Sequence, residues 1–238
     1  MSSENWRTAT RLLHDAPNRT EFGETSEAIF LTSGFVYDSA EQAAATFTGD
    51  VEHFQYSRFG NPTVDTLQER LALLEGAEAC IATSTGMGAV SSALLAHVKT
   101  GERVVASRAI FGSCYWIVTS LLPRYGIETE LVDGDDYEAW ERALSRPTAA
   151  VLIESPSNPM LDVLDIQRIA DLAHKAGALL MVDNVFASPI GQSPLKLGAA
   201  VVLYSCTKHL AGPGRVLGGA VLGREQWHKD TPQPFTRH

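Results

Sequence analysis

A lysine, two hydroxyls and an aspartate follow two of the most apolar runs of this chain. Lys208 comes shortly after the run AVVLY, with Ser205 and Thr207 in between, and Asp183 ends the run ALLMV. A lysine at the edge of an apolar core can be desolvated, which lowers its pKa and makes its amine a Schiff-base nucleophile. The alternative is an ordinary surface lysine after a strand, since lysine side chains are mostly exposed.

Asp183 has a chemical use beside such a lysine. A carboxylate against a pyridine nitrogen keeps that nitrogen protonated, so that the ring can withdraw electrons from a substrate carbanion, and pyridoxal phosphate (PLP) chemistry needs this pairing. The charge-assisted hydrogen bond contributes about 1.5–3 kcal/mol. An aspartate here is equally typical of a helix N-cap or a turn, and this alternative stays open.

The segment STGMGAV, residues 84–90, is a candidate phosphate site. Small residues between an apolar run and a helical pattern leave unpaired N–H groups at a helix N-terminus, with Gly86 and Met87 in its first turn. A tight strand-to-helix turn has the same composition, so both interpretations remain. The nucleotide motifs GxGxxG and GxxxxGK[ST] and the hydrolase motif GxSxG are absent from the sequence.

Three more segments carry side chains suited to a flat, phosphorylated ligand. Tyr56 and Arg58 in QYSRFGNP combine a phenol with a guanidinium that can bind phosphate through two N–H groups. Phe111 can stack on a ring, and Asn158, framed by prolines, can donate to a ligand oxygen. The structural alternatives are a solvated loop arginine, a core phenylalanine and a turn asparagine.

Seven short apolar runs, bounded by turn residues, predict buried strands. They are ACIAT, RVVAS, IETELV, AAVLIE, ALLMVD, AVVLYS and GGAVLG. Helical patterns lie between most of them, the clearest being TVDTLQERLALLEG, GMGAVSSALLAHV, SCYWIVTSLLPRYG, DYEAWERAL and DIQRIADLAHKAG. The alternation predicts an α/β fold, with helices on both faces of a mostly parallel sheet. Ligands bind such sheets at the carboxyl ends of the strands, where the candidate residues fall.

Composition restricts the class of protein further. The chain has 238 residues, 45% hydrophobic and 20% charged, which is ordinary for a globular protein with one large core. A formal net charge of −9 disfavours nucleic acid and anionic membranes as partners. The three cysteines and the histidines show no metal or disulfide spacing, so no metal site is expected. No signal-like or long apolar segment is present, which predicts a cytoplasmic protein.

In chain order, YSRFGNPT, STGMGA, RAIFGS, ESPSNP, VDN and SCTKH resemble the Cys/Met-metabolism family of PLP-dependent enzymes, which has fold type I. The resemblance covers about residues 25–238. Phe111, where many relatives have tyrosine, makes the chain most similar to the sulfhydrylase subgroup. That subgroup converts O-succinylhomoserine, or its O-acetyl counterpart, and sulfide to homocysteine in methionine biosynthesis. Cystathionine γ-synthase, a γ-lyase and a noncatalytic PLP-binding fragment are the alternatives, with a nicotinamide dehydrogenase as a distant one.

The resemblance also implies a role for each candidate residue. Lys208 would bond to the cofactor and later transfer protons, while Asp183 would hold the pyridine nitrogen. Phe111 would stack on the ring, Asn158 would approach its phenolic oxygen, and Glu154 is a candidate for the substrate side. The phosphate contacts implied are Gly86, Met87, Ser205 and Thr207 of one subunit, and Tyr56 and Arg58 of a neighbour.

An assembly and a division of the chain follow from the same resemblance. Residues 1–60 would form an N-terminal arm that contacts a neighbouring subunit, and residues 61–238 would form the PLP-binding large domain. The expected homo-oligomer is a dimer at least, and a tetramer as is usual in the family. Because relatives continue into a smaller C-terminal substrate domain, the chain is expected to be a truncated piece. Ala211 and Pro213 depart from the aspartate and glutamine of the sulfhydrylase subgroup.

Overall fold

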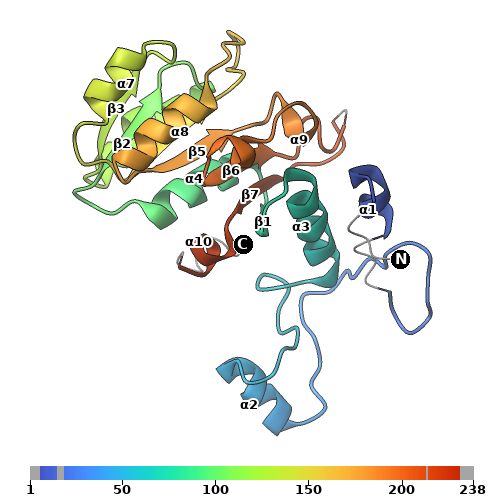
Figure 1. Cartoon of the computed structure of the whole chain (residues 1–238). Helices are drawn as coiled ribbons and strands as arrows, with labels where there is room; N and C mark the ends of the chain where they lie inside the picture. Colours follow the sequence, from blue (N-terminus) through green and yellow to red (C-terminus); the bar gives the residue numbers. More distant parts are fainter. Residues whose placement is uncertain (1–5, 15–18, 213, 231–238) are drawn as a thin grey trace.

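A seven-stranded sheet lies at the centre of the fold (Figure 1). The computed structural model describes residues 6–14, 19–212 and 214–230. The strands are β1 Ala79–Thr83, β2 Arg103–Ser107, β3 Glu128–Val132, β4 Ala150–Glu154, β5 Leu179–Asp183, β6 Val201–Ser205 and β7 Gly219–Gly223. Their order is β1-β7-β6-β5-β4-β2-β3. β7 runs antiparallel to both of its neighbours, β1 and β6, and the other described strand pairs are parallel. The predicted α/β fold with a mostly parallel sheet is confirmed, and every strand falls on an expected run.

Helices cover both faces of this sheet, as the continuous apolar strands require. One face packs on α3 Pro62–Glu75, α7 Tyr137–Ala143 and α8 Ile166–Lys175. The other face packs on α4 Gly86–His97, α5 Gly112–Trp116, the π-helical turn η2 Ile117–Leu121 and α6 Leu122–Arg124. Alternation along β5 divides the core, since Leu180 and Val182 enter the first cluster and Met181 the second.

Two helical predictions differ from the structure. The pattern over residues 113–126 predicts one helix, but the backbone passes from α5 through η2 to α6. Pro123 lies in α6 and has no N–H to donate, so a regular α-helical ladder cannot run unbroken through this segment. The second difference is α10 Glu225–Asp230, since none of the expected helical patterns covers this polar stretch, and a Lys229–Glu225 ion pair lies one turn apart on it. The remaining short elements are α9 Ser188–Gly191 and η3 Pro194–Leu197.

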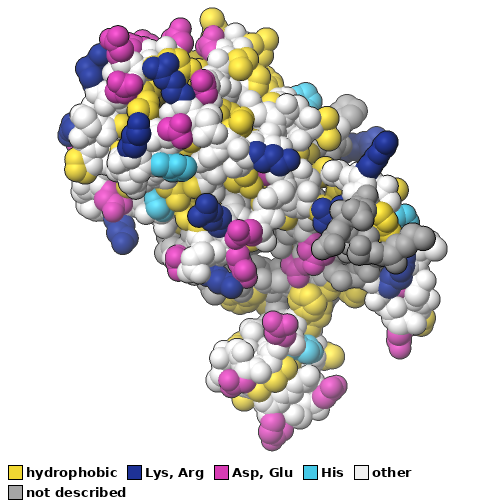
Figure 2. Space-filling model, viewed as in Figure 1, with side chains coloured by type: hydrophobic (Ala, Val, Ile, Leu, Met, Phe, Trp, Pro, Cys, Tyr) yellow, Lys and Arg dark blue, Asp and Glu magenta, His cyan; other side chains and the backbone are white. Residues whose placement is uncertain are grey.

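The part of the chain before α3 is an extended arm that carries α1 Thr8–His14 and α2 Ala40–Thr48. Figure 1 shows α2 standing away from the sheet. The arm is tied to α3 by Asn61, whose side chain caps that helix and donates to the Phe30 carbonyl at 3.0 Å. Large apolar side chains at the surface of the arm include Leu31, 96% exposed, and Phe47, 72% exposed. Figure 2 shows hydrophobic side chains on the surface of the part of the molecule that stands away from the sheet. The division at residue 60 and the contact with a neighbouring subunit stay predictions.

Candidate functional site

The candidate residues gather at one edge of the sheet. Asp183 ends β5 and is paired in register with Glu154, which ends the neighbouring parallel strand β4. Ser205 ends β6, the neighbour of β5 on the other side. Because β1 and β6 both run antiparallel to β7, the turn from β1 into α4 lies at this edge too. The structure therefore brings a carboxylate pair, a hydroxyl and a helix N-terminus to the carboxyl ends of four strands.

The N-terminus of α4 is held against the end of β6. The side chain of Thr85 caps this helix by accepting the Gly88 N–H at 2.9 Å. The first intrahelical bond runs from Ala89 N–H to Thr85 O at 3.1 Å, so the N–H groups of Gly86 and Met87 precede the helical ladder. A Cβ on Gly86 would lie 2.5 Å from the Ser205 Cβ and 2.9 Å from its Cα. Only glycine permits this close approach. The Gly86 and Met87 N–H groups and the Ser205 hydroxyl, called the cradle below, are groups that suit a phosphate.

Gly86→Ala is expected to disrupt this cradle. The added methyl group cannot fit without moving the β6 backbone, so we expect destabilisation by about 1–3 kcal/mol and weaker PLP binding. Thermal unfolding and a PLP titration measure the two effects. Gly112→Ala is the matched control, because Gly112 also opens a helix but nothing lies within 4 Å of its Cβ position. Equal behaviour of the two variants would refute the steric argument.

Asp183 and Glu154 are buried carboxyls without a cationic partner among the described ion pairs. Asp183 is 8% exposed and accepts the Val185 N–H at 3.1 Å. Burial raises its pKa to about 6. Burial, followed by the nearby charge of Asp183, raises the pKa of Glu154 to about 8. Such a pair would be stabilised by a positively charged group, which a protonated pyridine nitrogen would supply.

The stability of the cofactor-free chain is expected to fall between about pH 4 and pH 8. Asp183, Glu154 and Glu75 have folded-state pKa values of about 6, 8 and 7, all above their ordinary values. The folded state therefore binds more protons than the unfolded state in this range, and each rise in pH favours unfolding. Urea unfolding at several pH values measures this slope. Asp183→Asn should remove the loss of folding stability that occurs up to about pH 6. A folding stability that rises with pH over this range would contradict the raised pKa values of these carboxyls.

Lys208 lies in the turn that follows β6. Its backbone N–H donates to the Ser205 carbonyl at 3.2 Å, and its side chain is exposed. Lys208 is thus an exposed lysine in this chain, because the turn carries the residue past the end of the sheet, and its bond to a cofactor stays a prediction. The Thr207 hydroxyl accepts the Gly218 N–H at 3.1 Å and donates to the Gly218 carbonyl at 3.3 Å. Ala211 belongs to the same turn, while Pro213 lies outside the described residues.

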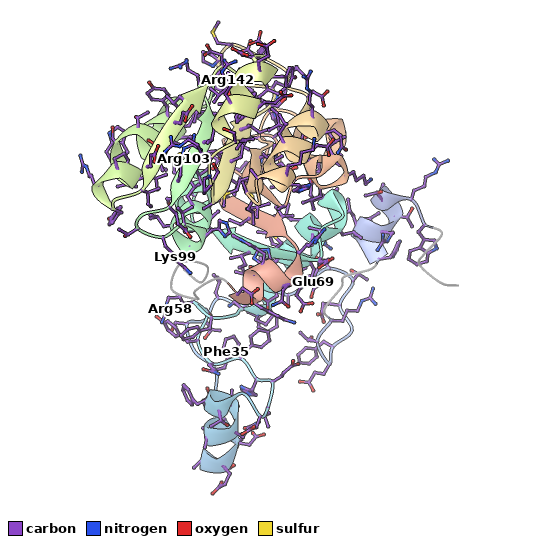
Figure 3. All side chains as sticks on the ribbon, turned by 60° about the vertical axis from the view of Figure 1, so that its left-hand side comes forward. Phe35, Arg58, Glu69, Lys99, Arg103 and Arg142 are labelled. Carbon is purple, nitrogen blue, oxygen red and sulfur yellow. The ribbon has the colours of Figure 1, made fainter. Side chains whose placement is uncertain are left out.

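Phe111 and Asn158 flank the carboxylate pair, and the arm residues lie elsewhere. Phe111 is 41% exposed and is therefore not a core residue of this chain, and its stacking on a ring stays a prediction. Asn158 is half-buried in the loop after β4. The Arg58 guanidinium lies 4.3 Å from the centroid of the Phe59 ring. Figure 3 shows Arg58 on the arm, near Phe35. No hydrogen bond or ring contact in the described structure joins Tyr56 or Arg58 to Asp183, and their contact with the phosphate of a neighbouring subunit stays a prediction.

A buried polar network beneath the site was not predicted. The Tyr204 hydroxyl donates to the Glu75 carboxylate, and the Asn184 side chain donates to the Tyr204 oxygen at 2.6 Å. Gln192 donates to the Asn184 side chain at 2.8 Å. Asn184 directly follows Asp183, so the network fixes the backbone that carries this carboxyl. The available signal was Tyr204, because a tyrosine inside a buried apolar run needs a partner for its hydroxyl.

Neither a membrane span nor a metal cluster is found among the residues that the structure describes. Within residues 6–14, 19–212 and 214–230, no helix has the length and apolar character to cross a membrane. The same ranges hold no group of three or more His, Cys, Asp or Glu side chains placed to bind a metal ion.

Comparisons with known proteins identify what the chain is similar to. It is 52% identical over 220 residues to an O-succinylhomoserine sulfhydrylase of Mycobacterium tuberculosis, covering 92% of this chain and 54% of the relative. It is 41% identical over 223 residues to an L-methionine γ-lyase of Porphyromonas gingivalis, covering 93% and 56%. The chain thus spans about half the length of the curated relatives it matches.

Solved structures share the fold. A Campylobacter jejuni structure containing N′-pyridoxyl-lysine-5′-monophosphate superimposes with a TM-score of 0.88 at 33% identity, covering 95% of this chain and 56% of that one. A Xanthomonas oryzae cystathionine γ-synthase gives a TM-score of 0.87 at 33% identity, covering 98% and 61%. Residues 9–237 match the sequence family described as Cys/Met metabolism PLP-dependent enzyme. With the close approach of Gly86 to Ser205 and the buried Asp183 at the expected strand ends, the chain belongs to the Cys/Met-metabolism family of PLP-dependent enzymes.

Proposed function

We propose that this chain is the cofactor-binding part of an enzyme that converts O-succinylhomoserine and sulfide to homocysteine and succinate. The observation that carries this proposal is its 52% identity to an O-succinylhomoserine sulfhydrylase over 92% of the chain, with a second such relative from Pseudomonas aeruginosa at 45%. In the overall reaction, the sulfur of sulfide forms a bond to the γ-carbon, and the bond from that carbon to the ester oxygen breaks. Succinate leaves with the electron pair.

The residues present fit PLP. The Gly86 and Met87 amides and the Ser205 hydroxyl would bind its phosphate, because they converge where a Cβ on Gly86 could not fit. Thr207 would join them if its hydroxyl turned from Gly218. Asp183 would hold the pyridine nitrogen, since its buried carboxyl has only a backbone amide among its hydrogen-bond partners in the described structure.

The remaining ring contacts come from residues around the carboxylate pair. Phe111 would cover one face of the ring and exclude water from it, and Asn158 would donate to the phenolic oxygen. When bound, PLP acts as the electron sink for carbon acids next to the substrate nitrogen. The exposed Lys208 amine would attach the cofactor and then move protons at the α- and β-carbons of the substrate.

The assembly we propose is a homo-oligomer in which the arm of one subunit completes the site of another. Tyr56 and Arg58 lie on the arm, and the guanidinium is free of any described carboxylate within ion-pair distance. Exposed apolar side chains on the same arm support a protein contact there. A dimer is the smallest assembly that serves this purpose, and we propose a tetramer as the full assembly.

Product analysis tests this function. Purified protein with PLP, O-succinylhomoserine and sulfide should give homocysteine and succinate in equal amounts. O-Acetylhomoserine is the control for the acyl group, and cysteine in place of sulfide would give cystathionine if the enzyme is a γ-synthase. No homocysteine from a protein that binds PLP would refute the proposed reaction.

The second candidate function is a γ-lyase, which the 41% identity to an L-methionine γ-lyase favours. Release of a 2-oxo acid and ammonia from methionine, without added sulfide, would identify it. Binding of PLP without turnover of any of these substrates would favour the noncatalytic alternative.

A further inference from the structure

Glu154 touches the backbone of two residues assigned to the cofactor ring. Its carboxylate accepts the backbone N–H of Phe111, which lies 43 positions earlier in the sequence. The backbone N–H of Asn158 also interacts with this carboxyl. Glu154 is also paired in register with Asp183 on the neighbouring strand, and the charge of Asp183 contributes to the raised pKa of Glu154. One buried side chain, 4% exposed, thus connects three of the residues around the ring.

The surroundings of Glu154 argue against an ordinary structural ion pair. Among the described salt bridges none includes Glu154, and the nearby Arg108 is paired with Asp133 at 2.7 Å. Phe111 N-caps α5 without any side-chain cap of its own, so the long-range bond from Glu154 holds the start of that helix. Burial of Glu154 is thus accompanied by no described ion pair, and its carboxyl instead bonds the backbone of two loops.

We propose that Glu154 is a positioning residue, which fixes Phe111 over the cofactor ring and Asn158 at its edge. The inference rests on the proposed cofactor site and adds a residue that acts through the other two. The function of the side chain is to accept backbone N–H groups, and an acceptor need not be charged for this purpose. A buried second charge beside Asp183 would be unfavourable, which is consistent with a Glu154 pKa of about 8 and a protonated carboxyl at neutral pH.

The test compares two substitutions of Glu154, one that keeps a hydrogen-bond acceptor and one of similar length that lacks it. Glu154→Gln keeps an oxygen for the Phe111 N–H, whereas Glu154→Met keeps the length and removes the acceptor. Each protein, stripped of cofactor, is titrated with PLP, and the visible circular dichroism of the bound cofactor reports the asymmetry of its surroundings. Glu154→Gln should keep the dissociation constant within about twofold, and Glu154→Met should raise it about 10-fold to 100-fold and weaken the dichroic band.

A double-mutant cycle then separates positioning from general destabilisation. If Glu154 acts through Phe111, Phe111→Ala should weaken PLP binding much less in the Glu154→Met background than alone. Thr148→Val is the matched control, because Thr148 is a buried polar side chain that accepts a bond from Arg103 at 2.7 Å and precedes the start of β4, at the opposite end of that strand from Glu154. It should lower the thermal stability and leave the dichroic band unchanged.

The outcomes are distinct. Wild-type affinity and dichroism in Glu154→Met, or a Gln variant as impaired as the Met variant, would overturn the positioning role. If Glu154→Met does not fold, hydrogen exchange at the Phe111 amide decides, since slow exchange in both wild type and Glu154→Gln is expected and fast exchange overturns the proposal. Failure of the wild-type protein to bind PLP would instead remove the proposed function.

Discussion

Replacing Lys208 with alanine is expected to abolish covalent attachment of PLP. Borohydride reduces a lysine–cofactor linkage to a stable secondary amine, so wild-type protein treated with PLP and borohydride should carry one pyridoxyl group on the peptide that contains Lys208. The variant should carry none there. Turnover should fall by about 10²–10⁴-fold, because the same amine is proposed to transfer protons at the substrate. Peptide mass mapping and product analysis measure the two effects.

Lys175→Ala is the control for this experiment. Lys175 is an exposed lysine that ends α8 and precedes the start of β5, so it lies at the opposite edge of the sheet from the strand-end cluster, and its loss should leave the adduct and the turnover intact. The adduct should survive also in Gly112→Ala, which changes a helix start without touching the cradle. A pyridoxyl group on another lysine, or none on folded wild-type protein, would contradict the assignment of Lys208.

The fold was predictable because its strands are buried on both faces. A strand such as β6, Val201–Ser205, is a continuous apolar run, and such a run can be recognised without knowledge of its neighbours. The turn residues after each run then fix which side chains reach the ligand edge. This reasoning placed Asp183, Ser205 and Gly86 at one edge, and the register of the sheet agrees.

Contacts between distant segments were not predictable in this way. Glu154 accepts a bond from Phe111, and Tyr204 bonds to Glu75, which is 129 positions away. Periodicity shows that a residue is buried but not which polar group it meets. The exposure of Lys208 was not predictable for the same reason, because it depends on how the turn after β6 folds and not on the apolar run before it. The polar details of the site therefore required the structure.

Asp183→Asn is expected to have the second large effect. Asparagine keeps the shape of the side chain and removes its charge, so it no longer favours a protonated pyridine nitrogen. Loss of the charge-assisted bond should weaken PLP binding by about 10-fold to 100-fold, and turnover should fall further, because the ring becomes a poorer electron acceptor. Cofactor titration and product analysis measure both quantities. Glu154→Gln is the matched control, because it makes the same acid-to-amide change at the neighbouring buried side chain and should keep near-normal affinity.

A cofactor analogue methylated at the pyridine nitrogen sharpens this prediction. Its ring carries a fixed positive charge, so it should restore part of the turnover of Asp183→Asn if the role of Asp183 is to maintain that charge. A variant with wild-type affinity and turnover, or one that the analogue leaves equally inactive while still binding it, would contradict this role.

The pH dependence of cofactor binding tests the same charge independently. Burial raises the pKa of Asp183 to about 6 in the chain without cofactor, and a pyridinium beside it should lower that pKa again. The ionised Asp183 carboxylate is the form that binds the pyridinium. The contribution of Asp183 to PLP affinity should therefore rise with pH through about 6 and be constant above it. This direction is opposite to the fall in stability expected for the cofactor-free protein. A bound cation at Asp183 therefore converts a buried charge that destabilises the fold at neutral pH into one that stabilises it.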